Sequence, residues 1–63
     1  MHKITQVFRY KGATLSIADA MQALIALWKG DPYAQEKAAG ALGGASRSGF
    51  IAQNHRGYWV RQR

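Results

Sequence analysis

One apolar-periodic segment, residues 17–29, constrains the fold more than any other part of the sequence. Its apolar side chains recur at the period of an amphipathic helix, at Ile17, Met21, Leu24 and Trp28. Ser16 precedes the segment, and Asp19 follows Ser16 by three positions, a spacing typical of a capping box at a helix N-terminus. The pattern predicts a helix over about 17–29 that supplies most of the core.

A second helix is expected directly after this one. Gly30 can end a helix in the left-handed conformation, and Asp31 followed by Pro32 is typical of a new helix start. The alanine-rich stretch that follows predicts a helix over about 32–42, which the pair Gly43 and Gly44 would end.

The two ends of the chain favour strands. Residues 2–10 alternate, with Ile4, Phe8 and Tyr10 on one face, which predicts an N-terminal strand. Residues 13–15 could be a short return strand or only the approach to the first helix. Near the C-terminus, aromatic and β-branched residues over about 50–53 and 58–62 flank Asn54-His55-Arg56-Gly57, which predicts a hairpin with a left-handed final loop residue.

Residues 46–54 allow a second interpretation. Gly40, Gly44 and Phe50 have the spacing of a helix-turn-helix, so "AQEKAAGALGGASRSGFIAQNHRG" resembles the helix-turn-helix family of DNA-binding proteins. The resemblance implies a recognition helix from Ser46 to about Asn54, with Arg47, Ser48, Ile51 and Asn54 toward a major groove. The composition favours the hairpin, which resembles the wing of winged-helix proteins, and the two resemblances together cover residues 34–60. Winged-helix proteins place three helices before the wing, and we expect a chain of this length to be too short for three full helices there.

These elements predict an α+β fold for residues 1–63 as one small basic domain. Two helices would pack on a small sheet in which the C-terminal strand pairs with the N-terminal one. Such pairing would give both terminal strands the hydrogen-bond partners that each lacks alone.

The positive charge of the chain is concentrated toward its two ends. The net charge is +6, from nine Lys and Arg against three Asp and Glu. Residues 1–15 and 44–63 contain no acid, and all three acids lie in residues 16–43. If the ends meet in space, they form one basic face of the kind that a polyanion contacts.

Catalytic and cofactor chemistry are not indicated. The chain has no cysteine, two histidines and three acids, too few for a closed zinc site, and no serine has a His and carboxylate arrangement nearby in sequence. Phosphate-binding glycine motifs are absent from the sequence. We therefore expect a protein that is not an enzyme and has no metal or cofactor.

Compartment and assembly are also expectations from the composition. The start lacks the apolar run of an export signal, and the longest apolar stretch is too short to span a bilayer, so we expect a cytoplasmic protein without a membrane. A domain this small, without disulfides or metal, is expected to gain stability by self-association, most simply as a dimer.

The first functional hypothesis is a nucleic-acid-binding protein, with duplex DNA preferred over RNA, that acts as a transcriptional or other accessory factor. The alternative is a small interaction protein of the phage or mobile-element kind that inhibits or scaffolds a protein partner. The candidate nucleic-acid contacts are Lys3, Arg9, Lys11, Arg47, Ser48, Asn54, His55, Arg56, Trp59, Arg61 and Arg63.

Overall fold

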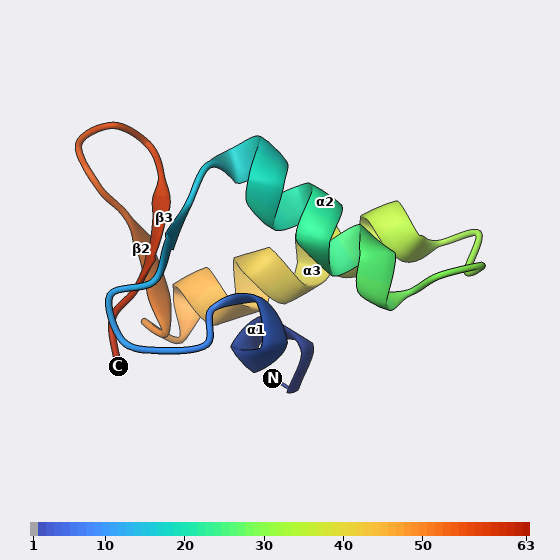
Figure 1. Cartoon of the computed structure of the whole chain (residues 1–63), viewed down its shortest axis with the longest axis horizontal. Coiled ribbons are helices and arrows are strands. Elements are labelled where there is room, and N and C mark those ends of the chain that lie inside the picture. Colours follow the sequence, from blue (N-terminus) through green and yellow to red (C-terminus); the bar gives the residue numbers. More distant parts are fainter. Residues whose placement is uncertain (1) are drawn as a thin grey trace.

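The computed structural model describes residues 2–63 and contains three helices and a three-stranded antiparallel sheet (Figure 1). The elements follow one another as α1 (His2–Val7), β1 (Thr14–Leu15), α2 (Ile17–Leu27), α3 (Ala34–Arg47), β2 (Ile51–Gln53) and β3 (Trp59–Arg61). The predicted α+β class is confirmed, and a third helix is added to the two expected.

The expected N-terminal strand over 2–10 is wrong, because residues 2–7 form α1. Ile4 and Phe8 are four residues apart, a spacing that places them on one face of a helix as well as on one face of a strand. Both are buried in the core with α2 and α3, at 2% and 0% exposure. Burial of this pair between two helices therefore decides the conformation of a segment whose pattern fits both.

The sheet has the order β1-β3-β2. The C-terminal strand pairs with the short return strand, Thr14 opposite Val60 and Leu15 opposite Trp59, and not with residues 2–10 as expected. Strands β2 and β3 form the predicted hairpin, inside the bounds expected for it, with Ala52 opposite Val60. The hairpin alternative for residues 46–54 is therefore the one found, and those residues form no separate recognition helix.

Helix α2 begins as its capping signal predicts. The Ser16 hydroxyl accepts a hydrogen bond from the Asp19 N–H at 3.1 Å. The helix ends at Leu27, two residues before the expected end, and Gly30 adopts a φ of +81° in the turn that follows.

Helix α3 is longer than expected, because it continues through Gly43 and Gly44 to Arg47. It ends where Gly49 adopts a φ of +80°, and the N–H groups of Gly49 and Phe50 donate to the carbonyls of Ser46 and Ala45. That pair of bonds is a Schellman motif, which satisfies the last carbonyls of the helix. Gly40 and Gly44 both lie inside α3, so their spacing marks no turn.

The core lies where α1, α2, α3 and the inner face of the sheet meet. Its largest fully buried side chains are Phe8, Ile4, Leu24 and Ile51. Along residues 2–63, no helix combines the length and the apolar character needed to cross a lipid bilayer.

Candidate nucleic-acid interface

Three segments that are far apart in sequence meet at one end of the molecule: the loop after α1, the C-terminal end of α3 and the chain terminus (Figure 1). The Gly12 N–H donates to the Arg61 carbonyl at 2.9 Å, and the Arg61 N–H donates to the Ala13 carbonyl at 2.9 Å. These bonds extend the pairing of β1 with β3 and hold the loop against the last strand. The two acid-free ends of the sequence therefore do meet, through residues 8–15.

Arg61 is bonded into this junction. Its Nη1 donates to the Phe8 carbonyl at 2.8 Å and its Nε to the Arg63 carbonyl at 3.1 Å. Its guanidinium also lies over the Phe50 ring, with Cζ 4.6 Å from the ring centroid. Because Phe8 directly precedes Arg9, this bond joins the chain segments that carry Arg9 and Arg61.

Arg63 joins the C-terminal residues to the end of α3 through a hydrogen bond from its Nη2 to the Ser48 carbonyl. Arg47 precedes Ser48 in the last turn of α3. A cation is favourable there because the C-terminal end of a helix carries the negative pole of the helix dipole. We call this cluster the basic end, which comprises Arg9, Lys11, Arg47, Arg61 and Arg63.

The corner between α2 and α3 lies at the opposite end of the long axis of the molecule (Figure 1). It carries Asp31 and Glu36, two of the three acids. Asp31 accepts hydrogen bonds from Lys37 Nζ at 2.5 Å and from the Tyr33 N–H at 2.8 Å, and these bonds lower the pKa of its carboxyl. This acidic corner also holds Lys29 and Lys37, so its formal charges balance, and the uncompensated positive charge of the molecule lies elsewhere, including at the basic end.

The hairpin loop holds three of the predicted contacts away from the basic end. Asn54 Oδ1 accepts hydrogen bonds from the N–H groups of Arg56 and Tyr58, at 2.9 and 3.1 Å, so its side chain shapes the loop. Gly57 has the predicted left-handed conformation, with a φ of +81°. His55 and Arg56 are exposed at the tip, where they can reach a ligand.

Two predicted contact residues are engaged inside the fold. Trp59 is half-buried and packs against the core, and its indole Nε1 is buried without a hydrogen bond to any residue in 2–63. The Ser48 hydroxyl donates to the Ala45 carbonyl at 3.0 Å. Ile51, which the recognition-helix interpretation placed toward a groove, is fully buried.

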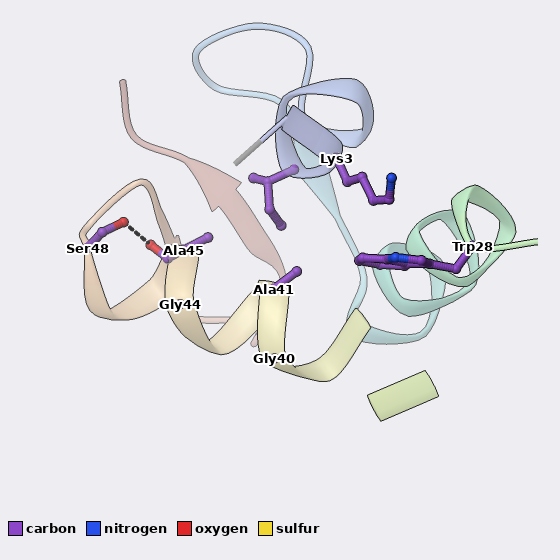
Figure 2. A pocket seen from close by; sticks show the side chains of 8 residues that line it. Lys3, Trp28, Gly40, Ala41, Gly44, Ala45 and Ser48 are labelled. Carbon is purple, nitrogen blue, oxygen red and sulfur yellow. Dashed lines mark hydrogen bonds between the residues drawn. The ribbon is translucent and has the colours of Figure 1, made fainter. Parts of the chain in front are cut away.

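Lys3 belongs to a different surface, a groove between α1 and α3 with a volume of about 510 Å³ (Figure 2). Its Nζ lies 5.1 Å from the centroid of the Trp28 ring, which closes one end of the groove. The floor is formed by small residues of α3, Gly40, Ala41, Gly44 and Ala45. No acid lines this groove, and Lys3 is its one charged group among the residues that the structure describes.

Tyr10 lies between Arg9 and Lys11 of the basic end and is not among the contacts predicted from the sequence. It is the most exposed of the large hydrophobic side chains in the described chain, at 69%. The signal was present in the sequence, where Tyr10 stands between Arg9 and Lys11, but assignment of residues 2–10 to a strand placed Tyr10 on the apolar face.

The basic end offers cations and one aromatic ring, and residues 2–63 contain no cluster of His, Cys, Asp and Glu able to hold a metal ion. This arrangement can bind an anionic, partly aromatic ligand. No family model matches the chain, and no curated protein and no solved structure shows significant similarity to it.

Proposed function

We propose that this protein binds nucleic acid through its basic end and acts as a non-enzymatic regulatory or accessory factor in the cytoplasm. The observation that carries the proposal is that bonds of Arg61 and Arg63 join three separate segments, and these segments also carry Arg9, Lys11 and Arg47. Arginine pairs bidentately with phosphate, and a cluster of cations without acids attracts a polyanion at long range.

The order of the elements supports the same proposal. Three helices precede the hairpin, as in the winged-helix proteins that the hairpin resembles, and duplex DNA is the ligand which that resemblance implies. In a helix-turn-helix the second helix enters the major groove, a role that would fall to α3. The N-terminal turn of a recognition helix contacts the base edges, but this turn of α3 carries Glu36 and lies at the corner remote from the basic end, and the exposed middle of α3 carries Ala39 and Gly40, which have no side-chain groups to read bases. We therefore expect contacts with the sugar–phosphate backbone to dominate and sequence preference to be small.

A salt series tests the proposal. Labelled DNA should bind at low salt, with an affinity that falls linearly on a log-log plot with a slope of about −0.9 per phosphate neutralised. The double variant Arg9→Gln, Lys11→Gln should make the slope shallower by up to about 2. Lys29→Gln is the matched control, because Lys29 is exposed beside the acidic corner, and its slope should equal that of the wild type. Micromolar protein that shifts no DNA or RNA at low salt would refute the proposal.

The α1–α3 groove favours a second candidate function, binding of a protein partner. Its apolar floor and its single cation, Lys3, suit an amphipathic helix that carries one acidic residue. The test is a pull-down after nuclease treatment, in which the wild type should recover one partner in stoichiometric amount. Gly44→Leu should lose this partner, because its side chain fills the floor of the groove. A Cβ at Gly44 meets no other atom within 4 Å, so the fold can accept the substitution. Ala39→Leu, at an exposed position of the same helix outside the groove, should retain that partner. A partner that both variants retain would exclude the groove as its binding site.

A further inference from the structure

Tyr10 is exposed at a place where the backbone is firmly held. It begins a four-residue turn in which the Ala13 N–H donates to the Tyr10 carbonyl at 3.0 Å. Gly12 occupies the third position with a φ of +90°, a conformation that glycine adopts at little cost. Gly12 and Ala13 are both bonded to β3 at Arg61, the first through its N–H and the second through its carbonyl. The ring therefore extends into solvent from a fixed base, and a ligand that covers it has little backbone to order.

Cations precede and follow this ring in the sequence, and one of them is held against α1, because Arg9 Nε donates to the Gln6 carbonyl at 3.3 Å. Arg9 and Lys11 flank it in sequence, and both are exposed. Arg61 lies behind the loop, bonded to the carbonyl of Phe8 two residues before Tyr10. The Arg61 guanidinium has five N–H donors on three nitrogens. Its two hydrogen bonds use two of these nitrogens, Nε and Nη1.

An exposed aromatic ring whose sequence neighbours are cations matches the chemistry of a nucleotide with a free base. The flat base stacks on the ring, and the phosphates on either side of that nucleotide contact the cations. A base within a duplex cannot do this, because its neighbours already cover both of its faces.

On the basis of the function proposed above, we infer that Tyr10 stacks an unpaired base, so that the basic end prefers nucleic acid with unpaired nucleotides over a continuous duplex. The phosphates that flank this base contact Arg9 and Lys11. Trp59, the aromatic residue among the contacts expected from the sequence, has its indole packed against the core.

Tyr33 provides a matched control within the same chain. It is nearly as exposed as Tyr10, at 65%, but lies at the acidic corner between Asp31 and Glu36. Loss of either ring removes a similar exposed aromatic surface. Lys37, the cation near Tyr33, is paired with Asp31, whereas Arg9 and Lys11 beside Tyr10 have no acid within residues 1–15.

The experiment measures fluorescence anisotropy of three labelled DNAs: a blunt duplex, the same duplex with a short unpaired overhang, and the single strand. Wild-type protein should bind the overhang and the single strand more tightly than the blunt duplex. Tyr10→Ala should weaken binding to these two by roughly 5-fold or more, the usual effect of removing one stacked ring. Tyr10→Phe should retain wild-type affinity, and Tyr33→Ala should change none of the three affinities.

Tyr10→Leu separates the loss of stacking from the loss of apolar surface. It keeps an apolar side chain without a π face, so its affinities should equal those of Tyr10→Ala. Equal affinity of Tyr10→Ala and wild type for the single strand would overturn the inference, as would an equal loss on all three DNAs. Those outcomes leave the proposed function intact, because binding of the blunt duplex persists. Failure of the wild-type protein to bind any of the three DNAs at low salt would instead refute the proposed function itself.

Discussion

Arg61 is held by two backbone carbonyls and one aromatic ring, so the fold itself depends on this cation. We predict that Arg61→Ala lowers the free energy of unfolding by about 1–3 kcal/mol, because it leaves the carbonyl of the buried Phe8 without its charged donor and removes the contact with Phe50. Lys11→Ala, at an exposed position of the same basic end, should change it by less than about 0.5 kcal/mol. Urea denaturation of both variants measures the difference, and equal midpoints would contradict the structural role of Arg61.

Asp31 gives a prediction about pH at the same scale. Its carboxyl has a pKa below the ordinary value because Lys37 and the Tyr33 N–H bond to its charged form. A carboxyl with a depressed pKa in the folded state contributes stability above its unfolded pKa, and this contribution is lost as the pH falls through the folded pKa. The melting temperature of the wild type should therefore fall between neutral pH and about pH 3, and Asp31→Asn should make this fall smaller. A fall of equal size in Asp31→Asn would show that Asp31 is not responsible.

At the scale of the element, α3 carries glycines that its own packing does not require. A Cβ at Gly40 or Gly44 meets no atom within 4 Å, and both residues are helical. We predict that Gly40→Ala and Gly44→Ala each raise the free energy of unfolding by about 0.5–1 kcal/mol. Gly49→Ala should lower it, because Gly49 ends the helix with a φ of +80°. Thermal melts compare the three variants. A lower melting temperature for Gly40→Ala would contradict the prediction, because it would show that the added methyl group is unfavourable at this position.

The elements also show which parts of the fold are encoded locally. Ser16 and Gly57 were predictable, because a side-chain cap and a left-handed turn residue act within a few residues of themselves. Residues 2–7 were not, because a short segment with Ile4 and Phe8 four positions apart fits a strand and a helix equally, and only burial against α2 and α3 selects between them. The end of α3 depends on Gly49, since Gly43 and Gly44 are tolerated inside the helix at a modest cost.

At the scale of the whole molecule, the sequence predicted the meeting of its two basic ends but not the surface that results. The charge pattern can be read without the fold, so the contribution of Arg9, Lys11 and Arg63 to one end could be predicted from the sequence. The aromatic residue beside them could not be predicted, because the sheet register turns Trp59 toward the core with Leu15 and Ile51. Tyr10 is exposed only because residues 8–13 form a loop in place of a strand.

The uncompensated positive charge of the basic end also affects the stability of the molecule. The molecule extends 32 Å along its longest axis, and at about 10 mM salt the Debye length of about 30 Å lets every cation of the basic end repel the others. At physiological ionic strength the length is about 8 Å, and only close neighbours interact. We therefore predict that the melting temperature rises by several degrees as NaCl increases over this range, since about 1 kcal/mol shifts the melting temperature of a domain this small by roughly 4–8 °C. Arg9→Gln with Lys11→Gln should raise the melting temperature at low salt and reduce its dependence on salt, whereas Lys29→Gln should do neither. An equal salt dependence in all three proteins would show that repulsion within the basic end does not limit the stability of the fold.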